Sequence, residues 1–495
     1  MLTWLGNVAS LKYFIGELWL ALACCVVLML PLIPKFRNVR MSWITLTALV
    51  FAGICVLRLP TDGGGIFFGM LAIDGLSKFF KIFFVLSTLV VVLMTEVGRE
   101  VPDFRKPEFY SILLGVLIGA FLAASATDLL MMYLAIELLS LGSYVLAGFS
   151  RIEKTSDEAS MKYILYGGLS TGAMLFGMSY LYGLTGSTNL IAIREALEAN
   201  QIHPLVFFVS FLLIMVGIGY KISAVPFHFW APDVYQGAPT SITAFLSVAS
   251  KGAGFAAFIR IFYTSFLTLN GEGVWSPVGQ LDWRILLSIL AIVTMTFGNL
   301  AAFGQNNVKR LLAYSGIAHA GYILVGAIAL NQAGMQSILF YLLTYLFTNL
   351  AAFTVVLILA DCNGVEEIEG YKSLGTRSPW LAFCLAVALF SLIGVPPMAG
   401  FLGKWFLFAA AVRTLDPWCV AAVVAGLLNS VLSVYYYFRI MKAMYLEKAE
   451  EVGPIRTHST LNWVATAMTL PVLLIIFDGG SLYDWTGRLS QMLLG

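Results

Sequence analysis

Long apolar stretches, separated by short segments that carry polar residues, glycine or proline, run through almost the whole chain. A helix that crosses a bilayer needs about 20 mostly apolar residues. The sequence therefore predicts an all-α polytopic membrane protein with about 14 transmembrane helices. The predicted segments are 12–31, 42–59, 75–95, 109–124, 127–149, 160–184, 205–234, 240–265, 284–303, 308–330, 336–360, 379–412, 417–445 and 460–478.

Two of these segments are too long for one straight crossing. A single helix over 379–412 would be about 50 Å long, against a hydrocarbon core of about 30 Å. Segment 205–234 contains Ser-Ala-Val-Pro at 223–226, and segment 379–412 contains Ile-Gly-Val-Pro-Pro at 393–397. Proline removes a backbone donor and clashes with the preceding turn, so we expect discontinuous helices in the seventh and twelfth segments. A simple proline kink is the alternative, because membrane helices tolerate proline.

An internal repeat supports the two breaks. Residues 140–148 are similar to 318–326 at an offset of 178, and 161–166 to 335–340 at an offset of 174. The Val-Pro pairs of the breaks align at an offset of 170. The repeats lie five helices apart, an odd number, so one is inverted relative to the other, as in many ion-coupled transporters. We expect N-terminal helices in 1–108, two inverted five-helix repeats in 109–265 and 284–445, and a loop with a final helix in 446–495.

The distribution of lysine and arginine predicts the orientation, because cytoplasmic loops carry an excess of these residues. Loops after even-numbered segments hold little beyond Arg194, Arg284 and Arg413. We therefore expect the loops after odd-numbered segments to be cytoplasmic and both termini to be periplasmic. The basic residues of the odd-numbered loops are Lys35, Arg37, Arg40, Arg99, Arg105, Lys106, Arg151, Lys154, Lys309, Arg310, Lys372, Arg377, Lys448 and Arg456.

Composition agrees with a membrane-embedded chain and excludes several classes of function. Of the 495 residues, 60% are hydrophobic and 11% charged, against about 45–50% and about 25% in soluble domains. The net charge of +2, without a basic tract, gives no sign of nucleic-acid binding. The six cysteines form no C-x-x-C motif, and there is no Walker A or complete dinucleotide fingerprint. We expect no cofactor, no metal site and no cleavable signal peptide on this chain.

Four charged residues lie inside or beside apolar runs: Glu137, Lys221, Lys251 and Lys404. A charge at the bilayer centre costs at least about 2.5–3.5 kcal/mol, so such residues usually face a bundle interior and serve transport. We expect the Lys221 ammonium to reach Glu137 across the bundle, where opposite charge favours both ionised forms and desolvation favours the neutral ones. A buried lysine also releases its proton readily, which an arginine does not. The alternative for Glu137 is a buried carboxylate that serves only packing.

Further candidates extend this group into a proton relay. Lys251 lies halfway along segment 240–265 and Lys404 follows the second break; the alternative for both is a lysine that snorkels to the interface. His319 has an ordinary pKa near neutral, although a lone core histidine is more often structural. Lys162 is either a feed to the relay or an interfacial lysine. Asp74, Lys78 and Lys81 are interpreted as interface charges, and His228 and Asp233 flank the first break.

Three stretches resemble a known family: 132–140 (MYLAIELLS), 221–239 (KISAVPFHFWAPDVYQGAP) and 307–315 (NVKRLLAYS). They are similar to the antiporter-like membrane subunits of respiratory complex I, and the lysines at 251 and 404 favour the subunit N family of NADH-quinone oxidoreductases. The resemblance implies a Glu137–Lys221 ion pair, a central relay lysine at 251, a terminal lysine at 404 and a further lysine at 162.

The resemblance also implies a function and partners. The chain is then a proton-translocating subunit of a bacterial inner-membrane complex, part of an enzyme without redox chemistry of its own. FMN, iron–sulfur clusters and the NADH site belong to other subunits, and quinone binds at a junction elsewhere. Neighbouring antiporter-like and small membrane subunits are the expected partners. The rival functions are a subunit of an Mrp-type monovalent cation/proton antiporter and a passive membrane scaffold.

Overall fold

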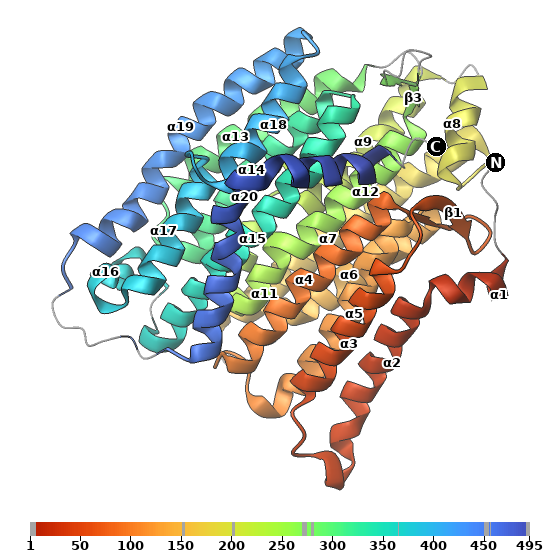
Figure 1. The fold of residues 1–495 in the computed structure, drawn as a ribbon. Helices are drawn as coiled ribbons and strands as arrows, with labels where there is room; N and C mark the ends of the chain where they lie inside the picture. Colours follow the sequence, from red (N-terminus) through yellow and green to blue (C-terminus); the bar gives the residue numbers. More distant parts are fainter. Residues whose placement is uncertain are drawn as a thin grey trace.

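The structure is a computed structural model that describes residues 6–150, 154–199, 203–269, 275–278, 282–364, 366–449, 455 and 457–491. It is a bundle of long helices with two small hairpins (Figure 1). The helices are α1 Asn7–Ser10, α2 Ile15–Met29, α3 Met41–Leu57, α4 Gly75–Val97, α5 Lys106–Ser125, α6 Leu129–Ala147, α7 Lys154–Thr185, α8 Leu190–Ala199, α9 Pro204–Ile222, α10 Trp230–Gly237, α11 Thr240–Phe245, α12 Lys251–Ser265, α13 Trp283–Ala302, α14 Val308–Ile328, α15 Gln332–Asn363, α16 Leu374–Arg377, α17 Pro379–Ile393, α18 Ala399–Val412, α19 Pro417–Leu446 and α20 Ser459–Gln491. The antiparallel hairpins pair β1 Asp62–Ile66 with β2 Leu71–Asp74 and β3 Leu267–Leu269 with β4 Trp275–Pro277. Short 3₁₀ turns are η1 Leu11–Tyr13, η2 Leu30–Leu32, η3 Pro34–Phe36, η4 Asp103–Arg105 and η6 Ile368–Tyr371, and η5 Leu246–Ser250 is a π-helix.

The predicted membrane segments correspond to helices throughout. Within the described ranges, twelve helices are long and apolar enough to cross a membrane. The predicted segment 42–59 corresponds to α3, which is shorter at 17 residues. Two features were not predicted. Helix α8 lies in the connection 185–203, and α20 continues past a kink at Asp478 to Gln491, so that its last part runs across the long helices (Figure 1).

Polar residues set the start of several long helices. The first backbone N–H groups of a helix lack partners within the helix, and a side-chain oxygen at the N-cap accepts from them. Asp74 forms a capping box with Ser77 at the start of α4. Asp128, Asn307 and Asn331 are the N-caps of α6, α14 and α15, where each side chain accepts from a backbone N–H group of the first turn. These caps fix the ends of the helices that carry the candidate site.

Both predicted helix breaks are confirmed. Helix α9 ends at Ile222, Ser223 has a left-handed conformation with φ of 61°, and α10 begins at Trp230. Helix α17 ends at Ile393, Gly394 has φ of 88°, and α18 begins at Ala399. Each discontinuity leaves the end of a half-helix inside the bundle, a geometry found at the ion sites of transporters.

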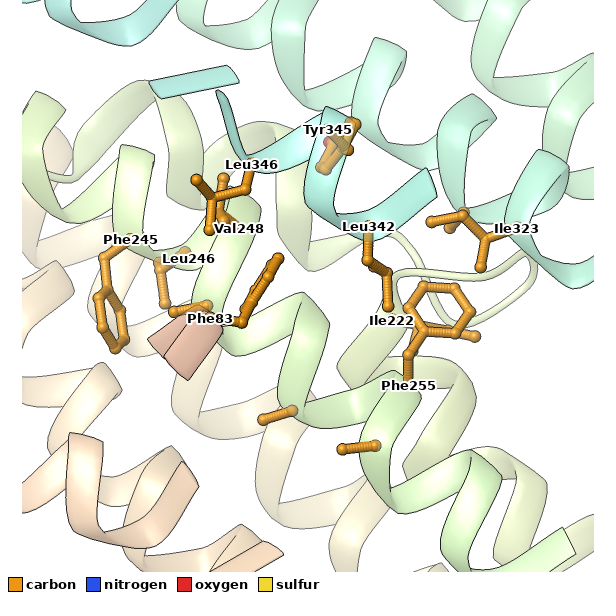
Figure 2. Packing of buried hydrophobic residues seen from close by; sticks show 14 of the residues in the cluster. Phe83, Ile222, Phe245, Leu246, Val248, Phe255, Ile323, Leu342, Tyr345 and Leu346 are labelled. Carbon is orange, nitrogen blue, oxygen red and sulfur yellow. The ribbon is translucent and has the colours of Figure 1, made fainter. Parts of the chain in front are cut away.

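The core of the bundle lies where α12, α14 and α15 meet their neighbours. The span Thr240–Ser265 is entirely buried within the chain, and the spans of α14 and α15 are nearly so. Figure 2 shows part of this core, where Ile222 of α9, Phe255 of α12 and Leu342 of α15 approach one another. Polar side chains on these helices are therefore screened from lipid by the rest of the protein.

Candidate proton-transfer axis

Lys221, Lys251, His319 and Lys404 are all buried, and Glu137 is half-buried. They lie on α9, α12, α14, α18 and α6, which are separate helices. A charged side chain that turns into a membrane bundle rather than toward lipid headgroups usually has a function. The burial of Lys251 and Lys404, at 2% and 5% exposure, contradicts the snorkelling alternative for both.

The structure does not bring Glu137 and Lys221 into contact. No salt bridge within 4.0 Å joins them, whereas the Lys221 Nζ donates a hydrogen bond of 3.0 Å to the Ser140 hydroxyl. Among the described residues the Glu137 Oε1 atom has no hydrogen-bond partner, although it is buried. Glu137 and Ser140 are one turn apart on α6, so Lys221 contacts the helix of its expected partner but not the carboxylate itself. The direct ion pair expected from the sequence is absent in this arrangement.

Lys251 links the two halves of the bundle. It is the first residue of α12 and follows the π-helix η5 directly; π-turns of this kind are frequent at functional sites. The Lys251 Nζ donates to the carbonyl oxygen of Gly316 on α14, at 2.6 Å. A Cβ on Gly316 would lie 2.8 Å from that Nζ. On the same helix as Lys251, a Cβ on Gly254 would lie 3.2 Å from the Lys221 Cβ, so α12 packs against α9 and reaches α14 through the Lys251 side chain.

His319 lies on α14 in a group of tyrosine hydroxyls. Its Nδ1 is 2.5 Å from the Tyr341 hydroxyl and its Nε2 is 3.3 Å from the Tyr437 hydroxyl. The Tyr437 hydroxyl is also hydrogen-bonded to Ser315. Ser315 precedes Gly316, the acceptor of Lys251. The polar contacts of His319 therefore reach the backbone segment that Lys251 contacts.

Lys404 lies against the end of the broken helix α17. Its Nζ donates to the Ile393 carbonyl oxygen at 2.8 Å and to the Ser430 hydroxyl at 3.2 Å. Ile393 is the last residue of α17, where unpaired carbonyl groups favour a cation. The Nζ also lies 4.4 Å from the centre of the Tyr322 ring, within cation–π range. The break between α17 and α18 therefore supplies the carbonyl acceptor of Lys404.

The tyrosines of this site are not predicted from the sequence. Within the described ranges, no hydrogen bond joins Lys221 to Lys251, Lys251 to His319 or His319 to Lys404 directly. The ring of Tyr345 lies 5.8 Å from the Lys251 Nζ, and Tyr322, Tyr341 and Tyr437 surround His319 or Lys404. Tyr341 and Tyr345 are four residues apart and share one face of α15, a spacing that would have revealed a polar stripe on an apolar helix.

Lys162 lies at the edge of this arrangement. Its Nζ is 2.6 Å from Asp233 and 2.6 Å from Glu158, and its side chain is 36% exposed. Arg310 on α14 contacts the other oxygen of Asp233 at 2.5 Å. This favours the interfacial alternative for Lys162.

Asp233 joins α7 to α14, and His228 is packed against the rings of Phe229 and Phe297.

Two charges expected at the interface are instead buried in ion pairs. Asp74 receives two hydrogen bonds from Arg260, at 2.5 and 2.6 Å, with 6% and 2% of the two side chains exposed. Burial alone would raise the pKa of Asp74, but the charge and hydrogen bonds of Arg260 outweigh it and lower that pKa. Lys81 pairs with Glu17 of α2 at 2.7 Å. Neither Arg260 nor Glu17 was singled out from the sequence. Lys78 is half-buried and donates to the Leu59 carbonyl oxygen at 2.9 Å.

The comparisons with known proteins fit this geometry. The family model "NADH:quinone oxidoreductase/Mrp antiporter, TM" matches residues 126–432. NADH-quinone oxidoreductase subunit N of Anaeromyxobacter sp. is 40% identical over 509 residues, covering 99% of this chain and 98% of the relative. Subunit N 2 of Sorangium cellulosum is 41% identical over 504 residues, covering 99% of each. The chain belongs to the NADH-quinone oxidoreductase subunit N family.

Solved structures agree with membership of the subunit N family. A chain of respiratory complex I from Thermus thermophilus is 31% identical, with a TM-score of 0.79 and coverage of 95% of this chain and 98% of that one. A chain of the Mrp complex from Dietzia sp. has a TM-score of 0.81 at 20% identity, with coverage of 98% and 100%. The latter likeness is one of fold. Among the residues that the structure describes, no group of three or more His, Cys, Asp and Glu is placed to hold a metal ion.

Proposed function

We propose that this chain is the proton-translocating membrane subunit of a bacterial NADH-quinone oxidoreductase, in which electron transfer in partner subunits drives proton movement along the buried axis. The observation that carries the proposal is the placement of three lysines and a histidine, all buried, at the meeting points of separate helices. Their polar contacts run from Ser140 on α6 to Ser430 on α19. Among the described residues these three lysines donate to a hydroxyl or to backbone carbonyl oxygens and not to a carboxylate. A passive scaffold has no need of buried lysines without an acidic partner, which are costly to place in a membrane.

Each residue has a proposed role that follows from its chemistry. Opening and closing of the Glu137–Lys221 pair alters the field at one end of the axis. Protons then shift along Lys251, His319 and Lys404, because neutral lysine and imidazole both accept a proton reversibly. A tyrosine hydroxyl can donate one hydrogen bond and accept another at the same time. The hydroxyls around His319 can therefore pass protons between relay groups that are not hydrogen-bonded to one another directly. Moving one charge against 100 mV costs about 2.3 kcal/mol, a free energy that modest changes of local field can supply.

The proposal extends to partners and orientation. The subunit N relatives favour an assembly with other membrane subunits of complex I, and FMN, iron–sulfur clusters and NADH are assigned to subunits other than this one. Lys162, Asp233 and Arg310 form an ion-pair network at one face, which we assign to the cytoplasm together with the basic loops. Both termini are then periplasmic. The two inverted repeats at 109–265 and 284–445 remain part of the proposal.

The alternative is a subunit of an Mrp-type cation/proton antiporter, which the fold likeness to the Dietzia complex favours. The two functions predict different neighbours. Purification of the chain from membranes in mild detergent, followed by identification of co-migrating subunits, separates them. Redox subunits that carry FMN or iron–sulfur clusters support the proposal, whereas small antiporter subunits without cofactors support the alternative.

The role of the axis is tested by Glu137→Ala in the assembled complex. Proton pumping driven by NADH is measured in inverted membrane vesicles, with assembly verified on native gels. Loss of most pumping with normal assembly is the expected result. Full pumping in this variant would contradict a proton-relay function and would favour a scaffold.

A further inference from the structure

The Lys221 ammonium is hydrogen-bonded to a neutral side chain, the Ser140 hydroxyl, and not to Glu137. We infer that Ser140 is a positioning residue that holds protonated Lys221 in a separated arrangement of the Glu137–Lys221 pair. This inference rests on the proposed function. It assigns the contact with Ser140 as the second of two positions of the lysine, the first being the contact with Glu137.

The geometry of α6 offers Lys221 two acceptors. Ser140 lies three residues after Glu137, so both side chains are on one face of the helix. The Ser140 hydroxyl donates its own proton to the Ile136 carbonyl oxygen at 2.6 Å. Its lone pairs therefore face Lys221, which is the donor. Ser140 and Lys221 are buried, so bulk water does not compete for this contact.

The other acceptor is available. The Glu137 Oε1 atom is buried and has no hydrogen-bond partner among the described residues. A buried carboxylate oxygen without a partner is unfavourable, and an approach of the Lys221 Nζ would satisfy it. The chain thus has one lysine and two acceptors a helical turn apart. Ser140 favours the separated arrangement, whereas charge favours the closed pair.

The strength of the Ser140 contact depends on the proton carried by Lys221. A hydrogen bond from a charged donor is about twice as strong as a neutral one. Loss of the proton weakens the contact, because the amine that remains is a poorer donor. Ser140 therefore stabilises the charged form in the separated position, and removal of its hydroxyl makes protonation of Lys221 there require a higher proton concentration.

The neighbours of Lys221 define what else responds to pH. Glu137 of α6 is the charged group that acts on Lys221 electrostatically. Tyr133 and Tyr144 of the same helix interact with Glu137. Helix α7 contributes Tyr163, whose carbonyl accepts from the Tyr220 hydroxyl. Helix α12 presents Gly254 to the Lys221 side chain and carries Lys251 one turn away. None of these tyrosines is expected to ionise near neutral pH.

The test compares Ser140→Ala with Ser143→Ala in the assembled complex. Ser143 is a matched control, because it is also buried on α6 and donates at 2.6 Å to the Leu139 carbonyl oxygen. NADH-driven proton pumping is measured between about pH 6 and 9 in inverted vesicles. S140A is expected to lower pumping about tenfold at alkaline pH and to move the alkaline limb about one unit toward lower pH. S143A keeps the parental profile, and Ser140→Thr, which retains the hydroxyl, restores it.

Each other outcome decides against the inference. Identical pH profiles for S140A and S143A would overturn it, as would a failure of S140T to differ from S140A. If S140A does not assemble, Ser140→Cys replaces it, because a thiol fills the space but is a weak acceptor; a parental profile in S140C overturns the inference. Glu137→Ala in the same experiment separates failure of this inference from failure of the proposed function. If Glu137→Ala loses pumping while S140A keeps the parental pH profile, only the role of Ser140 is contradicted.

Discussion

Lys251 on α12 donates a hydrogen bond of 2.6 Å to the carbonyl oxygen of Gly316 on α14. This contact joins segment 109–265 to segment 284–445, the two proposed repeats. Its geometry depends on the absence of a side chain at 316, since a Cβ there would lie 2.8 Å from the Lys251 Nζ and 3.1 Å from the Tyr345 hydroxyl. The centre of the proposed axis is therefore sensitive to a single methyl group.

Gly316→Ala is expected to reduce NADH-driven proton pumping by about tenfold or more. A displacement of about 1 Å of a reacting group can cost about 100-fold, and the added methyl group forces the ammonium to move. Gly115→Ala is the control, because a methyl group on Gly115 of α5 would meet no neighbouring side chain or helix within 4 Å. Pumping assays in vesicles that contain equal amounts of assembled complex compare the two. Equal pumping in both variants would show that the Lys251–Gly316 contact is not required.

Lys404→Arg tests whether the terminal lysine must release its proton. Arginine keeps the positive charge beside the Ile393 carbonyl but does not deprotonate in proteins. We expect K404R to assemble and to pump at least about tenfold less than the parent. Lys78→Arg is the matched control, since Lys78 also donates to a backbone carbonyl but lies outside the axis. Parental pumping by K404R would mean that position 404 needs only a charge.

Tyr437→Phe removes the hydroxyl that contacts both His319 and Ser315. A neutral hydrogen bond contributes about 0.5–1.5 kcal/mol, so a rate that depends on it should fall about two- to tenfold. Tyr371→Phe is the control, because the Tyr371 hydroxyl is buried without a hydrogen-bond partner among the described residues. Initial rates of proton uptake by vesicles measure the effect. Unequal assembly of the two variants must be corrected before the rates are compared, and equal corrected rates would exclude a role for the Tyr437 hydroxyl.

Asp74→Asn is expected to destabilise the fold. Removal of one partner from a buried ion pair typically costs about 3–5 kcal/mol, and Arg260 would keep an uncompensated charge. Arg284→Ala breaks the half-exposed Arg284–Asp282 pair and should cost no more than about 1 kcal/mol. Thermal unfolding of the purified complex measures both. Similar midpoints for the two variants would show that the buried pair contributes little.

The lowered pKa of Asp74 gives this pair a pH dependence of defined sign. A carboxyl with a lowered pKa in the folded state contributes stability above its unfolded pKa of about 3.9 and loses it as the pH falls through the folded value. The pair should therefore contribute fully at neutral pH. Its contribution should fall only below about pH 4, and the difference between parent and D74N should shrink there. A difference that shrinks between about pH 8 and 6 would contradict this assignment.

Much of the fold follows from sequence pattern. Apolar length predicts the long helices, and the Val-Pro pairs at 225–226 and 395–396 predict the two breaks. The buried positions of Lys251 and Lys404 follow from their place inside apolar runs. The π-helix before Lys251 and the kink at Asp478 were not predicted, because hydrophobic periodicity shows neither. The kink does have a local signal, since Asp478 is followed by Gly479 and Gly480.

The site was harder to predict than the fold. Periodicity shows that a charge is inside the bundle but not which group it contacts. Lys221 was therefore expected to pair with Glu137, although the rotamer it adopts takes it to Ser140. Asp74 was expected at the interface because its partner Arg260 is 186 residues away in the chain. The spacing of Tyr341 and Tyr345 places both on one face of α15, but the sequence does not show that this face meets His319 until the helices are assembled.

The central claim is that protons cross the membrane through the buried groups of this chain. The most direct test is the number of protons moved per NADH oxidised by the reconstituted complex with Lys251→Met, which keeps the apolar stem and removes the charge. The account predicts an assembled complex with a lower ratio than the parent and slower NADH oxidation. An unchanged ratio and an unchanged rate in K251M would contradict it.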